Sequence, residues 1–187
     1  MFKVSVALIL ILSLAAVASA EEGFDVRKVR WGMSEVDVRY SETGLKPAEI
    51  NANTLVYSEE VFSYPCSIAY EFINDKLFSV TYAFDIKNKG DALMLTHKMK
   101  LILGEKYKED KKASDKLSEI EKKFISCYAN DRTRVTLADT SMLPSKFVGV
   151  IYKSIELSPL AEAKEKAKKD AADAEKRKKF EEESRQF

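Results

Sequence analysis

A chain of 187 residues with 45% hydrophobic and 10% aromatic content can bury one globular core with extensions, or two very small cores. Its formal net charge of +1 gives no overall attraction to nucleic acid or to an anionic membrane. The composition therefore argues against a basic nucleic-acid-binding protein and is typical of an ordinary globular one.

Residues 1–20 have the three-part layout of a cleaved secretory signal peptide. Lys3 supplies a positive start, an apolar run extends to Val17, and small residues before Glu21 form a cleavage site after Ala20. An uncleaved membrane anchor is the alternative, but the run is shorter than the roughly 20 residues of a spanning helix. No cysteine stands directly after the run, which argues against a lipid anchor. We expect a periplasmic or secreted protein without stable membrane insertion.

Residues 21–157 are expected to form an α+β globular domain in which helices cover one face of an antiparallel sheet. Ser34 followed by Asp37 has the spacing of a helix N-cap with a capping box, and Gly44 is expected to end that short helix. Trp31 precedes the cap, and we expect it to pack the helix onto the sheet; stacking on a ligand is the alternative.

A hairpin over residues 66–84 is the strongest pattern in the chain, because large side chains alternate on both sides of the turn at 74–76. Short strands are expected before it, at 54–57 and 61–64. Pairing Phe72 with Phe78 would put seven large side chains on one face. These are Ile68, Tyr70, Phe72, Phe78, Val80, Tyr82 and Phe84.

A helix of about fourteen residues is predicted next, capped at Asp91 or its neighbour and ended by Gly104. Its apolar stripe is expected to cover the hairpin's apolar face. The stripe consists of Ala92, Leu95, Met99, Ile102 and Leu103. His97 lies on this helix without a second ligand at metal-binding spacing, so we assign it no metal or acid–base role.

The second half of the domain repeats the order of the first. After a charged segment at 106–123, read as a short exposed helix or a loop, strands are expected at 124–128, from Val135 to Leu137 and at 147–154. A turn at Asn130–Asp131 corresponds to the one at residues 74–76. The pattern suggests two half-repeats, about 29–88 and 89–157.

Cys66 and Cys127 are the two cysteines of the chain. Because we expect export to an oxidising compartment, we predict one disulfide between them. The alternatives are two separate small hydrophobic residues, or a catalytic thiol, for which no neighbouring Cys-x-x-Cys partner exists.

Residues 158–187 change to alanine, lysine and acidic residues, without glycine and with a single proline at Pro159. Acid–lysine pairs four residues apart, such as Glu162–Lys166, favour a helical tail. Its stripe of Leu160 and alanines is small, so the tail is either a solvated helix or a helix that binds a partner or self-associates as a coiled coil.

No phosphate-binding loop, nucleophile elbow or metal cluster occurs in the sequence, so no catalytic residue, metal ligand or cofactor is assigned. An extracytoplasmic hydrolase that uses carboxylates from distant positions is the enzymatic alternative. The lysines are balanced by acids and are not interleaved with exposed aromatics, which argues against nucleic acid as a partner.

The Trp31–Ser34 start, the short helix, the turn at 74–77 and the tyrosine- and phenylalanine-rich strands resemble small bacterial periplasmic α+β proteins. This class includes the helix-plus-three-strand domains of outer-membrane-assembly lipoproteins and the tandem domains of β-lactamase-inhibitor protein. The resemblance spans about residues 29–157 and is one of residue types. It implies binding to another protein of the cell envelope through a sheet face, although the lipidated cysteine of the lipoproteins is missing here.

Overall fold

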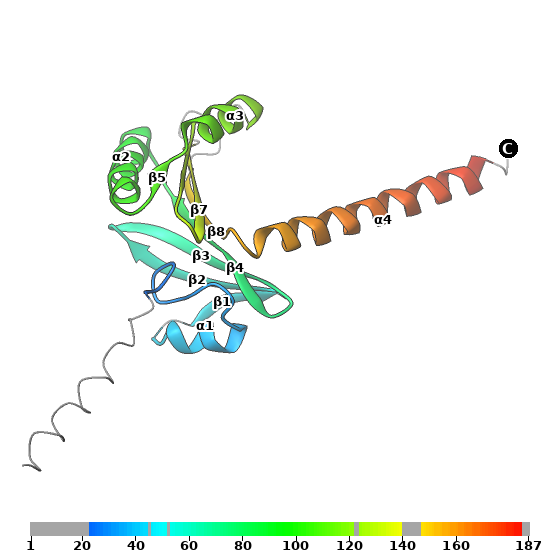
Figure 1. Ribbon diagram of the computed structural model, residues 1–187, viewed down its shortest axis with the longest axis horizontal. Coiled ribbons are helices and arrows are strands. Elements are labelled where there is room, and N and C mark those ends of the chain that lie inside the picture. The colour runs from blue at the N-terminus through cyan, green and yellow to red at the C-terminus, as the bar shows by residue number, and fades with distance from the viewer. Residues whose placement is uncertain (1–22, 45, 52, 122–123, 140–146, 185–187) are drawn as a thin grey trace, which may run out of the picture.

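The computed structural model describes residues 23–44, 46–51, 53–121, 124–139 and 147–184. Within these ranges the strands form one antiparallel sheet in the order β1-β2-β3-β4-β8-β7-β6-β5 (Figure 1), which confirms the α+β prediction. The strands are β1 (Pro47–Asn51), β2 (Thr54–Val61), β3 (Tyr64–Ile73), β4 (Lys76–Asp85), β5 (Lys108–Glu109), β6 (Phe124–Ala129), β7 (Thr133–Asp139) and β8 (Phe147–Ser154). The helices are α1 (Glu35–Ser41), α2 (Lys89–Lys106), α3 (Lys111–Glu121) and α4 (Ser158–Ser184).

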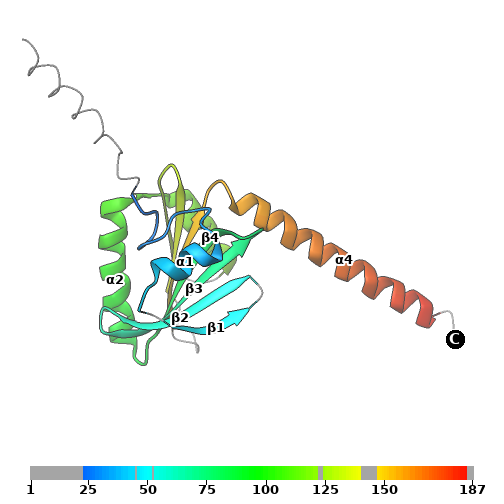
Figure 2. The same cartoon turned by 90° about the horizontal axis from the view of Figure 1, so that it is seen from below.

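One face of the sheet, which we call the covered face, carries the core. Alternate residues of β2, β3, β4, β8 and β7 are fully buried on it, among them Leu55, Ile68, Tyr70, Val80, Val150 and Leu137. Figure 2 shows α1 lying across the strands of the first half, with α2 beside it. The two helices thus divide the covered face between the two halves of the chain.

We expected α2 to cover the apolar face of the β3–β4 hairpin, and the structure corrects this expectation. α2 packs over β6, β7 and β8, where Thr96 Oγ1 donates a hydrogen bond of 3.1 Å to Asp139 Oδ2. The hairpin residue Tyr70 instead meets the end of α1, at Glu42. The predicted helix therefore packs mainly on the second set of strands, which follows the hairpin in the chain, and it meets the hairpin near Tyr82, which lines a cavity together with Leu103.

The start of α1 follows its sequence signal. The Ser34 hydroxyl accepts a hydrogen bond from the Asp37 amide, and the Asp37 carboxylate accepts one from the Ser34 amide. This reciprocal capping box satisfies two amides that the first turn would otherwise leave without partners. The helix ends at Ser41, with Glu42 rather than Gly44 as its cap.

The hairpin of β3 and β4 is present, but its register differs from the prediction. Asn74 and Asp75 both have positive φ, 50° and 57°, so they form a two-residue turn of the kind that matches strand twist. Phe72 therefore pairs with Leu77, and a bulge displaces Phe78 from the register we expected. Phe78 lies half-buried beside the first turns of α4 instead.

A second tight turn joins β2 to β3. β2 continues to Val61, and Phe62 and Ser63 turn the chain with φ of 55° and 68°. The separate strand expected at 61–64 is therefore wrong, since its middle residues form the hairpin turn.

α2 is longer than predicted. Its N-cap is Asn88, whose side chain accepts a hydrogen bond of 2.8 Å from the Asp91 amide. Gly104 does not end it, because the Tyr107 amide donates to the Leu103 carbonyl and both side chains are buried. Ala92, Leu95, Met99 and Leu103 are buried as expected, but Ile102 is partly exposed.

The charged segment after α2 forms the short strand β5 and the helix α3, and the tail forms α4. Only the first turns of α4 lie against the body, at β4, and Figure 1 shows the rest projecting away. Among the described residues, no helix combines the length and the hydrophobicity that crossing a membrane requires.

Candidate functional site

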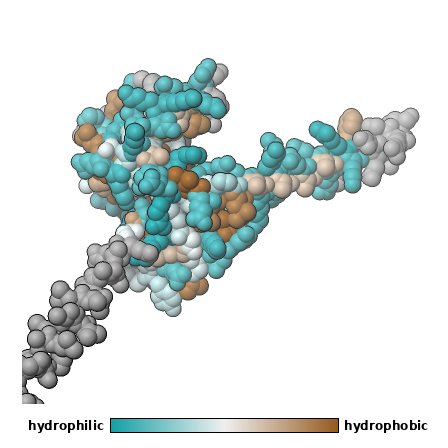
Figure 3. Space-filling model, in the orientation of Figure 1, coloured by the Kyte–Doolittle hydropathy of each residue, from teal (hydrophilic) through white to brown (hydrophobic). Residues whose placement is uncertain are grey.

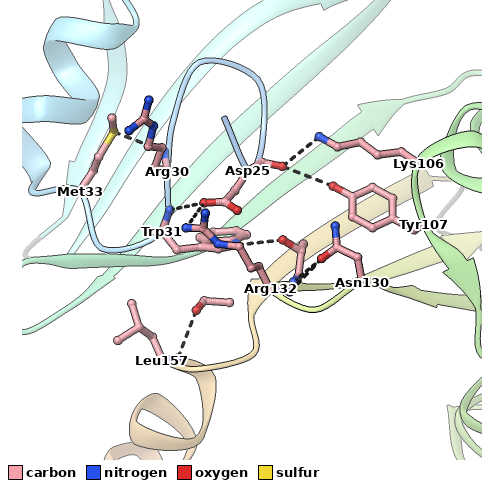
Figure 4. Close-up of polar contacts among 11 residues, drawn as sticks. Asp25, Arg30, Trp31, Met33, Lys106, Tyr107, Asn130, Arg132 and Leu157 are labelled. Carbon is pink, nitrogen blue, oxygen red and sulfur yellow. Dashed lines mark hydrogen bonds and ion pairs between the residues drawn. The ribbon is translucent and has the colours of Figure 1, made fainter. Parts of the chain in front are cut away.

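Asp25 joins the N-terminal segment to the second half of the chain (Figure 4). Its carboxylate accepts hydrogen bonds from the Trp31 amide (2.9 Å) and from Arg132, in the β6–β7 turn (3.0 Å). Its carbonyl accepts bonds of 3.3 Å from Lys106 and from the Tyr107 hydroxyl, at the end of α2. These contacts fix residues 25–31 in the space between α1 and α2.

Arg27, two residues after Asp25, contacts the first half of the chain instead of the second. Its guanidinium forms a bidentate ion pair with Glu59 of β2 and lies 3.0 Å from Glu42 at the end of α1. Glu42 is 1% exposed, and its Oε1 accepts a 2.5 Å hydrogen bond from the Tyr70 hydroxyl. We call Arg27, Glu42, Glu59 and Tyr70 the Arg27 cluster.

The electrostatics of the Arg27 cluster suit a structural role. The hydrogen bonds from Arg27 lower the pKa of Glu59, and burial raises the pKa of Tyr70. Glu59 is therefore held as an anion and Tyr70 as a neutral phenol at neutral pH. A hydrolytic pair needs one carboxyl group that carries a proton near neutral pH, whereas Glu59 is held as an anion by Arg27, which also lies beside Glu42.

A cleft of about 310 Å³ lies at the root of α4 and is lined in part by Trp31, Lys76, Arg132, Ser154 and Leu157. Trp31 is half-buried, and its indole Nε1 donates a 2.9 Å hydrogen bond to Thr133 Oγ1 of β7. The amide of Gly32 donates to the Leu77 carbonyl of β4. Trp31 thus packs the N-terminal segment onto the sheet between the two halves, and part of its ring faces the cleft.

A second cavity, of about 410 Å³, lies between the end of α2 and the turn at Asp25–Arg27. Its aromatic lining comes from Tyr82 of β4, Tyr152 of β8 and Tyr107. The ring centroid of Tyr152 lies 5.8 Å from that of Tyr82 and 6.2 Å from that of Tyr107. Burial raises the pKa of Tyr82 and of Tyr107 to about 12. At neutral pH these phenols are hydrogen-bonding groups and not bases.

The sheet's other face, which we call the open face, is exposed at Ser58 of β2, Ser67 of β3 and Ala83 of β4 and half-buried at Ala69 and Thr81. Small and hydroxyl-bearing side chains, together with Val56 and Ile151, project from it in two rows across β2, β3, β4, β8 and β7. The rows are Val56, Ala69, Thr81, Ile151, Thr136 and then Ser58, Ser67, Ala83, Gly149, Ala138. α3 lies at one border, where Ser114 bonds Cys127, and the first turns of α4 lie at another.

A third row of the open face holds two cations side by side. Arg134 of β7 lies directly opposite Lys153 of β8, and the row continues through Ser79 of β4 to the acidic residue Glu71 of β3. Neither cation forms an ion pair with a residue that the structure describes. Ser79 is fully buried, and its hydroxyl has no hydrogen-bond partner in the described part of the chain.

The predicted disulfide is wrong: Cys66 and Cys127 are free and buried. Cys66 of β3 pairs with Phe84 on the covered face, whereas Cys127 of β6 pairs with Thr136 on the open face. Four strand spacings separate β3 from β6, about 19 Å at the usual spacing, and a disulfide needs Cα atoms within roughly 7 Å. Burial raises the pKa of both thiols, so neither is poised as a thiolate nucleophile.

Ala20, the expected cleavage position, lies outside the described residues. His97 is exposed on α2, and no group of three or more potential metal-ligating side chains occurs in the described ranges.

Sequence reasoning missed Asp25, Arg27, Arg134 and Lys153. The first two lie in a segment without periodicity, and their partners are up to 107 positions away. Arg134 and Lys153 did carry a usable signal: each occupies an outward position of an alternating strand. Their juxtaposition became visible only with the register of β7 and β8.

Comparisons with protein-family models, with curated proteins and with solved structures gave no match to this chain. Function is therefore inferred from the geometry of the chain itself.

Proposed function

We propose that this protein is an exported binding protein that holds an acidic protein partner of the cell envelope on its open face and catalyses no reaction. The observation that carries the proposal is the cross-strand pair of Arg134 and Lys153 on that face. Like charges directly opposite each other destabilise a sheet, so the fold itself gains nothing from this pair. A carboxylate-bearing partner would neutralise both cations at once.

The side chains around the cation pair support the same proposal. Ala69, Thr81, Ala83 and Thr136 are small, so a partner can approach the sheet closely over several strands. α3 and the first turns of α4 border this surface. A surface of small side chains, with positive charge at the side that α4 borders, is suited to an extended or convex acidic segment.

The proposal is tested by photo-crosslinking from defined positions in cells that export the protein. A photoreactive residue replaces Ala83, which is exposed on the open face, and in a matched strain it replaces Tyr40, which is 74% exposed on α1. We expect a protein adduct of defined mass from position 83 and not from position 40. Arg134→Glu should reduce the adduct by at least about tenfold, since it places a negative charge where the partner's carboxylate binds.

Two outcomes contradict the proposal. One is an adduct from position 40 with none from position 83; the other is an adduct from position 83 that Arg134→Glu leaves unchanged. The export step has its own measurement, the intact mass of the protein recovered from the periplasm. A mass that begins at Glu21 supports export with cleavage after Ala20, and a chain that still carries residues 1–20 refutes it.

A second candidate is an assembly factor that self-associates through α4. The favouring observation is that α4 projects from the body and leaves Leu160 and Phe180 exposed, the latter at 72%. Sedimentation of the full chain and of a chain lacking residues 172–187 tests it. Loss of an oligomer on truncation supports this candidate, and monomeric behaviour of both chains excludes it.

A further inference from the structure

α2 is apolar on two opposite sides, but the sheet covers only one of them. Leu95, Met99 and Leu103 are buried against the strands. On the outer side, Met94 is 69% exposed and Leu101 is 59% exposed. Leu93 is also exposed, but it lies on the flank of this outer side, about 80° around the helix from Leu101. Figure 3 shows hydrophobic residues over α2 surrounded by hydrophilic ones.

The turn between β2 and β3 adds an aromatic ring to this stripe. Phe62 has φ of 55°, a conformation that is rare for a bulky residue, and its side chain is 40% exposed. The ammonium of Lys98, on α2, lies 4.1 Å from the centre of the Phe62 ring. A strained backbone thus holds an exposed aromatic side chain beside the outer side of α2.

Cations flank the stripe on both sides. With 3.6 residues per turn, Lys98 lies on one side of the Met94–Leu101 line and Lys100 on the other, and Lys89 lies near the start of the helix. None of these three ammonium groups forms an ion pair with a carboxylate in the described ranges. The two acids of the helix lie at its ends, Asp91 three residues before Met94 and Glu105 four residues after Leu101. The near-zero net charge of the whole chain conceals this local excess.

We propose that the outer side of α2, together with Phe62, rests on the surface of an anionic phospholipid bilayer. Leu93, Met94, Leu101 and Phe62 enter the boundary between headgroups and acyl chains, and the lysines contact lipid phosphates. Apolar residues between lysines on one helix face are the features of helices that lie in this interface. A protein partner fits less well, because a standard interface uses roughly 20–30 residues a side and this stripe is a single helix face.

The test measures the partition of the purified full protein onto vesicles of phosphatidylcholine, with and without phosphatidylglycerol. The double variant Met94→Asp/Leu101→Asp removes two apolar contacts and adds two charges that the lipid repels. Leu160→Asp is the matched control, because Leu160 is 49% exposed on α4, away from the stripe. Circular dichroism and thermal midpoints confirm that all variants remain folded, as expected for changes at exposed positions.

We expect the wild-type protein to bind vesicles that contain phosphatidylglycerol, and to bind more weakly as salt is raised, since salt screens the lysine–phosphate attraction. The double variant should partition at least about tenfold less, and Lys98→Glu/Lys100→Glu should also lose binding. Leu160→Asp should bind like wild type. The proposal is overturned if the wild-type protein ignores anionic vesicles or binds neutral ones equally. It is also overturned if Leu160→Asp loses as much binding as the double variant, or if the stripe variants abolish a protein crosslink and not vesicle binding.

Discussion

Replacing Arg27 by methionine tests whether the Arg27 cluster holds the N-terminal segment to the sheet. The substitution keeps an unbranched side chain but removes the guanidinium that Glu42 and Glu59 share. Glu42, 1% exposed, would remain buried without its cation, and its Oε2 already lacks a hydrogen-bond partner among the described residues. The expected effect is therefore a large loss of stability and not the small effect of a surface ion pair.

The expected loss in the free energy of unfolding follows from the burial of the Arg27–Glu42 pair. Removing one partner of a buried pair costs roughly 3–5 kcal/mol. We expect the lower end, about 3 kcal/mol, because the Arg27 side chain is 22% exposed and Tyr70 still donates to Glu42. With an m-value of about 2 kcal/mol/M, the urea midpoint should fall by about 1.5 M.

Arg39→Met is the matched control for Arg27→Met. Arg39 pairs with Glu35 at 2.7 Å on the surface of α1, where both side chains are about one-third exposed. Such a pair contributes about 0.5 kcal/mol or less, so the midpoint should fall by no more than about 0.3 M. Equal shifts for the two arginine variants would refute the assigned role of burial.

A double-mutant cycle separates the buried charge from lost packing. Adding Glu42→Gln to Arg27→Met removes the unpaired charge, so the double variant should be more stable than the sum of the two single losses predicts. Additive losses would show that the Arg27–Glu42 interaction contributes no coupling energy, contrary to the geometry.

Three further predictions concern single side chains. Ser79→Ala removes a fully buried hydroxyl without a partner, so unfolding in urea should show unchanged stability or a gain of about 1 kcal/mol; a clear loss would mean that the hydroxyl is bonded. Cys66 and Cys127 should react with a thiol reagent only after unfolding, and the urea midpoint should be the same with and without reductant; a lower midpoint in reductant would contradict the separation of the two thiols. Burial raises the pKa of Tyr82 from 10.0 to about 12, so its contribution to stability is complete below pH 10 and is lost as the pH rises through about 12. Tyr82→Phe should therefore flatten the fall in stability over that alkaline range, and an unchanged slope would refute the assignment.

Local sequence signals predicted the elements of the fold wherever a short stretch contains all the information. The capping box at Ser34 and Asp37 and the alternation of β3 and β4 need only neighbouring residues, and both are present in the structure. The errors occurred where one residue of register matters. The two-residue turn at Asn74–Asp75 and its bulge moved Phe78 out of the expected pairing.

The wrong disulfide prediction has a related cause, because it depended on strand pairing that the sequence does not reveal. Cys66 lies eight residues before Asn74, and Cys127 lies three residues before Asn130, so the two positions differ in parity within strands that each precede a turn. Side chains alternate between faces along each strand, and the observed pairings place Cys66 on the covered face and Cys127 on the open face. The sequence predicted both strands, but it did not reveal that β4 pairs with β8 and unites the two halves into one sheet. That pairing decided against the disulfide.

The alternation of side chains along β7 places the two proposed surfaces on opposite sides of the sheet. α2 packs on the covered face, with Thr96 bonded to Asp139, whereas Arg134 and Lys153 project from the open face. The sheet lies between the two surfaces, so an acidic partner and a bilayer can be bound at the same time without competing for residues. Changes at distant sites without shared contacts act independently. Arg134→Glu should therefore leave vesicle binding unchanged, and Met94→Asp/Leu101→Asp should leave the crosslink from position 83 unchanged. A variant that abolished both would indicate one shared surface and refute this arrangement.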